Sequence, residues 1–262
     1  STSTMQRTLI GRRYALLRTC DPISSGHDLD DGWRVRFCGW AGRGPLGCRA
    51  IADGYRGRNL RELDLPGARS DVGRGLDARA FRRRGFSRDI RGEFDVVLFF
   101  NIGTTLPSDA RANLTAFVEG GGGVVVLHHA LASYPDWPWW YEQVVGGRYL
   151  TAPDGDQPAS TYRQDEEIIA IPTRDHPVTA SLGGFPIHMY DETYQGMWIS
   201  PESEVLLRTG LSTSDGPIVW LGPHEWARVV VIQPGHGSGA HLNLAFRTIL
   251  RHAVLWSSRG SG

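Results

Sequence analysis

The chain has 262 residues, of which 40% are hydrophobic and 21% charged, so it is long enough to bury one large core or two small ones. No apolar run approaches the roughly 20 residues that span a bilayer, and three loosely spaced cysteines indicate neither a disulfide framework nor a zinc knuckle. The net charge is zero. Because the N-terminus has no signal-peptide core and the cysteines indicate no disulfides, we expect a cytoplasmic protein that binds no membrane.

Residues 1–92 are rich in arginine and glycine and lack regular patterning. Only Tyr14–Leu17 and Val35–Cys38 suggest strands. This part is either a loop-rich lobe or a stretch from a shifted or degenerate reading frame, because GC-rich codons read out of frame encode Arg, Gly, Ala and Pro. Its arginines have no interleaved aromatic residues and form no helical stripe, so no nucleic-acid partner is predicted.

Regular patterning begins at residue 93 and defines an α/β domain over residues 93–257. Phe94–Asn101 is an apolar run that ends in a polar residue, as expected of a buried parallel strand. Apolar residues at helical spacing follow, and glycines 120–123 end that helix. Val124–His128 is the next strand, and this strand–helix–strand unit predicts a parallel sheet.

The later elements are shorter. A short aromatic helix at Trp137–Val145 is closed by Gly146. An amphipathic helix runs from about Ala240 to Trp256, and residues 258–262 are expected to form a flexible tail. Between these helices the expected strands are Glu167–Ile171, Ile187–Thr193, Glu204–Thr209, Pro217–Gly222 and Arg228–Gln233.

Two imidazoles, those of His128 and His129, stand at the end of the strand that follows the glycines. Ligands bind at the carboxyl ends of strands in open α/β sheets, and imidazole both transfers protons and binds metals near neutral pH. The alternative is one packed histidine that a backbone carbonyl satisfies, beside another that caps the next turn.

Two carboxylates and two further histidines occur in later segments. Asp191 and Glu192 are adjacent in a strand, so their side chains point to opposite faces and at most one should reach the site. A solvated acidic edge is the alternative. His236 lies between glycines after an apolar strand, where the backbone can approach a ligand closely. His241 follows about one turn into the helix, where it joins His236 or caps the helix.

Nucleophilic catalysis by cysteine or serine is not predicted. The three cysteines precede the patterned region, and the chain has no G-x-S-x-G elbow. The aromatic residues around Trp137 and Tyr141 belong either to the core or to the mouth of a site, where rings stack on sugars.

Several short motifs follow one another in a characteristic order between Phe94 and Trp256. They are Phe94–Val97, Phe117–His128, Trp140–Tyr141 before Gly146–Gly147, Asp175–Val178, Tyr190–Tyr194, Arg228–Val231, Gly235–Gly237, Ala240–Asn243 and Phe246–Arg247. In this order and spacing they resemble the ThuA-like (trehalose-utilisation) family.

The resemblance implies a fold similar to class I glutamine amidotransferases, a flavodoxin-like three-layer sandwich with a mainly parallel sheet. In those enzymes a cysteine occupies the elbow after a central strand, whereas the family has a histidine there, which falls on His128. Cys-dependent amidotransferase chemistry is therefore not expected. The resemblance also implies a role in the catabolism of trehalose-type disaccharides through 3-keto sugar derivatives. The family opens with a hydrophobic strand and a Gly-Gly-His-type loop, of which Gly26–Asp28 is the only echo here, without the strand before it.

Together these observations predict a sugar-active enzyme that uses acid–base chemistry on a small-molecule substrate. The expected catalytic residues are His128 as general base or ligand, Asp191 or Glu192 as its acid/base partner, and His236. The residues expected to bind substrate are His27, His129, Trp137, Tyr141, Tyr194 and His241. A divalent metal held by His27, His128 and His236 is an alternative, and any other cofactor is unknown. The alternative function is a non-catalytic carbohydrate-binding or regulatory module, and a homo-oligomer is left open.

Overall fold

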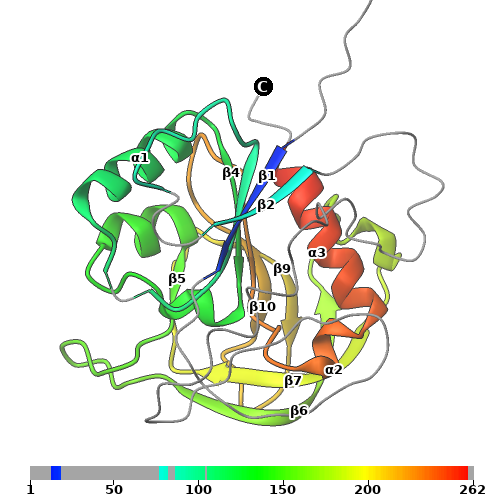
Figure 1. Cartoon of the computed structure of the whole chain (residues 1–262). Coiled ribbons are helices and arrows are strands. Elements are labelled where there is room, and N and C mark those ends of the chain that lie inside the picture. The colour runs from blue at the N-terminus through cyan, green and yellow to red at the C-terminus, as the bar shows by residue number, and fades with distance from the viewer. Residues whose placement is uncertain (1–12, 19–76, 82–85, 104, 259–262) are drawn as a thin grey trace, which may run out of the picture.

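A nine-stranded sheet forms the centre of the computed structural model, which describes residues 13–18, 77–81, 86–103 and 105–258 (Figure 1). Its strands lie in the order β2-β1-β3-β4-β11-β10-β9-β6-β7. Their bounds are β1 Arg13–Arg18, β2 Asp77–Phe81, β3 Val96–Phe100, β4 Gly123–Leu127, β6 Thr161–Pro172, β7 Ile187–Gln195, β9 Glu204–Thr209, β10 Pro217–Leu221 and β11 Val229–Ile232. A separate pair joins β5 Gly147–Arg148 to β8 Trp198–Ile199.

The sheet is mixed, with a parallel half and an antiparallel half. Strands β2, β1, β3, β4 and β11 run parallel, whereas β10, β9, β6 and β7 pair antiparallel with their neighbours. The expected α/β fold is therefore confirmed, but the expectation of a mainly parallel sheet is too simple. The parallel half is built mainly from continuous apolar runs. Beyond it, antiparallel strands such as β6 and β7, in which exposed and buried residues partly alternate, extend the sheet.

Helices cover both faces of the sheet (Figure 1). On one face lie α1 Ser108–Glu119 and the π-helix η3 Trp139–Val145, which ends at Gly146 in the left-handed region. On the other face lie α2 Ser238–His241 and α3 Leu244–Ser257. The described ranges also contain two short 3-10 helices, η2 His128–Ala132 and η4 Ala180–Leu182.

The single final helix expected from about Ala240 to Trp256 is in fact two helices. The chain breaks at Asn243, whose side chain accepts hydrogen bonds from the backbone N–H groups of Ala245 and Phe246 at the start of α3. Leu242, which lies at this break, is 64% exposed as a result.

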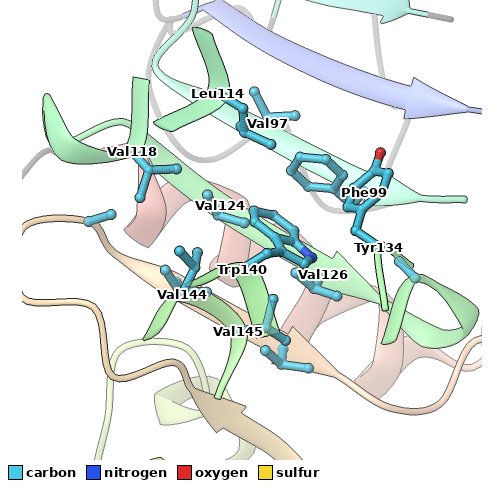
Figure 2. Packing of buried hydrophobic residues seen from close by; sticks show 14 of the residues in the cluster. Val97, Phe99, Leu114, Val118, Val124, Val126, Tyr134, Trp140, Val144 and Val145 are labelled. Carbon is cyan, nitrogen blue, oxygen red and sulfur yellow. The ribbon is translucent and has the colours of Figure 1, made fainter. Parts of the chain in front are cut away.

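The aromatic helix η3 contributes one of the two fully buried tryptophans among the described residues. Trp140 is fully buried, and its ring lies 4.8 Å from that of Phe99 on β3 and 6.0 Å from that of Tyr134 (Figure 2). Its neighbours on the helix, Val144 and Val145, pack into the same layer against the sheet. Burial of this size stabilises the domain by several kcal/mol, of the order of 2–3 kcal/mol per large side chain.

The part of the chain expected to be irregular contributes two strands to the main sheet. Strand β1 covers the suggested Tyr14–Leu17 and pairs with β2 on one side and β3 on the other. The suggested strand Tyr14–Leu17 is therefore confirmed. The suggested strand Val35–Cys38 and the Gly26–Asp28 echo lie outside the described residues, as do residues 259–262. Across the described ranges no helix has the length and apolarity needed to cross a bilayer.

Candidate functional site

Neighbouring strands bring several polar residues to the carboxyl edge of the parallel half. Asn101, His128 and Gln233 directly follow β3, β4 and β11, which are adjacent in the sheet. All three are almost completely buried. His128 turns sharply out of the strand with a φ of 51°, a left-handed conformation that is uncommon for any residue other than glycine. The register thus aligns three polar side chains across the ends of the central strands.

The ring of His128 is held by backbone and faces two other ionisable groups. Its Nδ1 lies 3.0 Å from the carbonyl oxygen of Gln233, which fixes Nδ1 as the protonated nitrogen and leaves a lone pair on Nε2. That Nε2 lies 3.2 Å from Nδ1 of His236 and 3.5 Å from Oε2 of Glu192. Burial lowers the pKa of His128 well below its usual value, and the nearby His129 and His236 lower it further. His128 is therefore a neutral imidazole at neutral pH.

Glu192 of β7 brings a buried carboxylate to the same point. Its Oε1 lies 3.2 Å from Nδ1 of His236 and also accepts a hydrogen bond from Nε2 of Gln164 at 3.2 Å. Burial raises the pKa of Glu192, while His236 and the Gln164 hydrogen bond act in the opposite direction. Two imidazoles and one carboxylate from three separate segments thus meet at one place.

Asp191 holds the loop that carries His236. Its carboxylate accepts hydrogen bonds from the backbone N–H groups of Gly235 at 3.2 Å, His236 at 3.0 Å and Glu192 at 2.6 Å. Burial raises the pKa of Asp191, against the lowering effect of the backbone amides of Glu192, His236 and Gly237. The two adjacent carboxylates therefore do different things: Glu192 faces the histidines, and Asp191 positions the loop.

Tyr194 covers the ring of His128. Its hydroxyl lies 3.1 Å from each ring nitrogen, and the two rings stack at 5.3 Å with an interplanar angle of 28°. Burial first, and the charge of Glu192 second, raise the pKa of Tyr194 well above its usual value, so the hydroxyl keeps its proton. Since Nδ1 of His128 donates to a carbonyl, the hydroxyl donates to Nε2. Tyr149 packs behind, 4.8 Å from Tyr194.

His129 and His241 flank the cluster from the side of β3. The ring of His129 lies 4.5 Å from Phe100 and 5.3 Å from His128. Burial, with smaller contributions from His236 and His241, lowers the pKa of His129 to about 4. Nε2 of His241 lies 2.9 Å from the carbonyl oxygen of Gly235, so His241 supports the loop rather than only capping its helix.

The aromatic residues expected to form a stacking wall pack elsewhere. Trp137 stacks on Trp139 and Trp140, and Arg111 lies over its ring. Tyr141 contacts Trp198 at 6.1 Å, and Arg148 lies over its ring. These contacts are with the η3 layer and its surroundings rather than with the histidine cluster. His27 lies outside the described residues.

A cavity of about 480 Å³ lies at the opposite, amino end of β4 and β11. It is lined by acidic and aromatic side chains that include Glu119, Glu142, Trp198 and Trp226. None of the expected site residues within the described ranges borders it. The cluster of His128, Glu192 and His236 therefore lies at the other end of these strands from this cavity.

Sequence reasoning missed several members of the site. The sequence did not identify Gln164, Tyr149 or Gln233. Gln233 could have been found, because it is a polar residue at the end of an expected apolar strand, which is the signal that identified His128. Among the described residues, two buried side-chain oxygens lack a hydrogen-bond partner, Oδ1 of Asn101 and Oε1 of Gln233. Both belong to the row of residues that follows the central strands. Donor atoms of His128, Glu192 and His236 all lie within 4.8 Å of one another, and these three residues could hold a metal ion.

The fold and the site together define an α/β protein with histidine in the strand-end elbow. The profile of the ThuA family, described as trehalose utilisation, matches residues 76–257, and the chain belongs to this family. No curated protein matches the sequence.

Solved structures share the fold at low sequence identity. A ThuA-like protein from Parabacteroides merdae is 16% identical, with 95% of this chain and 90% of that chain covered and a TM-score of 0.64. A ThuA-like protein from Bacteroides uniformis is 17% identical, with 99% and 97% covered and a TM-score of 0.59. A cytoplasmic protein from Salmonella typhimurium is 12% identical, with 70% and 82% covered and a TM-score of 0.52.

Proposed function

We propose that this chain is an enzyme of carbohydrate catabolism that acts on a trehalose-type disaccharide or its 3-keto derivative. Membership of the ThuA family supports a role related to trehalose utilisation. The observation that carries the catalytic part is the convergence of His128, Glu192 and His236 at the carboxyl edge of the sheet. Ligands of open α/β sheets bind at this edge.

The electrostatics of the cluster suit chemistry on sugar hydroxyl and carbonyl groups. Neutral His128 offers a lone pair on Nε2, as a general base or a ligand, and Glu192 is the adjacent acid/base group. Tyr194 supplies a protonated hydroxyl at the same point. His236 is half-exposed, so it is the member that an incoming sugar meets first.

The elbow position also argues against glutamine hydrolysis. His128 has the positive φ typical of a residue presented at a sharp turn after a strand, and it is an imidazole instead of a cysteine thiol. The helices on both faces of the sheet support a flavodoxin-like, amidotransferase-like framework from which amidotransferase chemistry has been lost. The name of the Salmonella typhimurium protein supports a cytoplasmic location for this chain.

The experiment is turnover of 3-keto disaccharides by the purified chain and its variants. We expect His128→Ala and His236→Gln to abolish turnover, and the second variant tests the site if the buried His128→Ala does not fold. His188→Gln is the matched control, because His188 is a half-exposed histidine of β7 outside the cluster. Unchanged turnover in His236→Gln would remove the cluster from the reaction. Sugar-dependent stabilisation of the wild type without product would instead identify a carbohydrate-binding or regulatory module.

A further inference from the structure

We propose that His128, Glu192 and His236 bind one divalent transition-metal cation of the zinc class. This differs from the set His27, His128 and His236 considered from the sequence, because a carboxylate takes the third position. The role of the cation rests on the proposed function, whereas its binding does not.

The spacing of the three donor atoms matches a tetrahedral metal site. Metal–ligand bonds of about 2.0–2.1 Å place neighbouring tetrahedral ligands about 3.3 Å apart. The observed separations are 3.2 Å between His128 Nε2 and His236 Nδ1, 3.2 Å between His236 Nδ1 and Glu192 Oε1, and 3.5 Å between His128 Nε2 and Glu192 Oε2. One ring nitrogen of each histidine and the carboxylate of Glu192 therefore already lie as far apart as neighbouring ligands of a tetrahedral metal ion.

The surroundings prepare two of the three groups as ligands. A metal-binding histidine usually donates its other ring N–H to a carbonyl or carboxylate, which fixes the tautomer. His128 does so, because Nδ1 faces the carbonyl oxygen of Gln233 at 3.0 Å. A ligating carboxylate is usually hydrogen-bonded as well, and Glu192 accepts from Gln164. Asp191 positions the backbone of His236 through two amide hydrogen bonds to the loop.

The site also has an entrance and an open position. The side chains of His128 and Glu192 are 1% and 7% exposed, whereas that of His236 is 50% exposed, so a cation can enter past the loop. Three protein ligands leave the fourth tetrahedral position for water or substrate, as in catalytic zinc sites with two histidines and a glutamate. Two imidazoles favour zinc or cobalt over magnesium or calcium, which prefer oxygen ligands.

The cation would have a direct role with a keto sugar. A carbonyl or hydroxyl oxygen at the open position would be polarised by the metal, which would stabilise negative charge on that oxygen. His128 and His236 are then ligands instead of proton carriers. The Tyr194 hydroxyl lies 3.1 Å from Nε2 of His128, and once the cation occupies the Nε2 lone pair this hydroxyl would donate instead to an oxygen bound to the metal.

The test is titration of the full chain with zinc chloride after treatment with a chelator, followed by calorimetry and metal analysis. We expect a single equivalent of zinc to bind in preference to magnesium. Loss of a group that only supports a metal ligand lowers metal affinity about 10–100-fold. Loss of a ligand itself should cost more, so Glu192→Gln and His236→Asn should each lower the affinity for zinc by at least about 100-fold. The more exposed His236→Asn carries the test if Glu192→Gln fails to fold. Cobalt should give the intense visible absorption of a four-coordinate site.

Glu167→Gln is the matched control. Glu167 lies 2.8 Å from Nε2 of His188 on the neighbouring strand, a surface carboxylate–imidazole pair that lacks a second histidine ligand in the described structure. We expect it to bind zinc as the wild type does. Equal binding by the wild type and Glu192→Gln, or no bound zinc, would overturn the site.

Activity separates this inference from the proposed function. Zinc binding that depends on Glu192, without any turnover of keto disaccharides, supports the metal site and contradicts the sugar enzyme. Turnover by chelator-treated protein at the rate of the zinc-loaded protein supports the sugar enzyme and overturns the role of the cation in the reaction, whereas the zinc titration alone decides whether the cation binds.

Discussion

Acidification from pH 7 to pH 5 is expected to destabilise the protein through His129, whose partly buried ring packs on Phe100. The pKa of His129 falls from 6.5 to about 4 in the folded chain. Below pH 6.5 the unfolded chain therefore binds a proton that the folded chain rejects, and the free energy of unfolding decreases as the pH falls towards 4.

The magnitude follows from the two pKa values. Each tenfold difference in proton affinity is worth about 1.4 kcal/mol, so the loss through His129 is about 2 kcal/mol at pH 5 and about 3 kcal/mol at pH 4. Such a loss is a large fraction of the roughly 5–15 kcal/mol by which domains are stable.

The assay is urea unfolding of the wild type and His129→Phe at pH 7, 6 and 5. Because the phenyl ring cannot titrate, the difference in unfolding free energy between the two proteins should shift by about 2 kcal/mol in favour of the variant over this range. Leu131→Ala is the control, since it removes a buried side chain of the same short helix and destabilises by an amount that is independent of pH. A wild-type-minus-variant difference that stays constant from pH 7 to pH 5 would refute the reasoning.

Three further predictions concern packing and the loop that carries His236. Trp140→Ala should cost about 3–5 kcal/mol in urea unfolding because it empties the centre of one core layer, and a loss below 1 kcal/mol would contradict the packing described. Asp191→Asn should cost about 2 kcal/mol and lower the melting temperature, because one amide of the loop loses a charged acceptor; an unchanged melt would show that the loop does not depend on it. Gly235→Ala should cost about 1–3 kcal/mol, because φ is +134° and the new Cβ would lie 3.1 Å from Leu127; wild-type stability in thermal unfolding would argue against this backbone conformation.

The sequence predicted best those strands whose bounds are set by the local pattern of apolar residues. Val124–His128 was expected as a strand, and β4 ends at Leu127, because a continuous valine run after glycines suits a strand buried on both faces. The predicted bounds of Glu204–Thr209 agree with β9.

Other elements depend on partners that are distant in sequence. Strand β6 begins at Thr161, well before the predicted Glu167, because its first residues are polar and exposed and are held by pairing with β7. Strand β2, Asp77–Phe81, has no apolar run and exists through its pairing with β1. Local patterning carries no signal for β2 or for the first residues of β6.

The candidate site shows the same division. His128 and His236 were identifiable because each follows an apolar strand, and the alternation of a strand predicted that only one of Asp191 and Glu192 would face them. The loop amides that bind Asp191 could not be predicted, since they lie more than 40 residues away in sequence. The partner of His128 Nδ1 is the backbone of Gln233, which no side-chain pattern reveals.

Anomalous scattering from a zinc-soaked crystal, measured on both sides of the zinc absorption edge, tests most directly whether the three strand-end side chains work as one site. The account predicts one strong peak about 2.0–2.2 Å from His128 Nε2, His236 Nδ1 and a carboxylate oxygen of Glu192. Zinc peaks found only elsewhere on the protein, with no peak between the rings of His128 and His236, would contradict it.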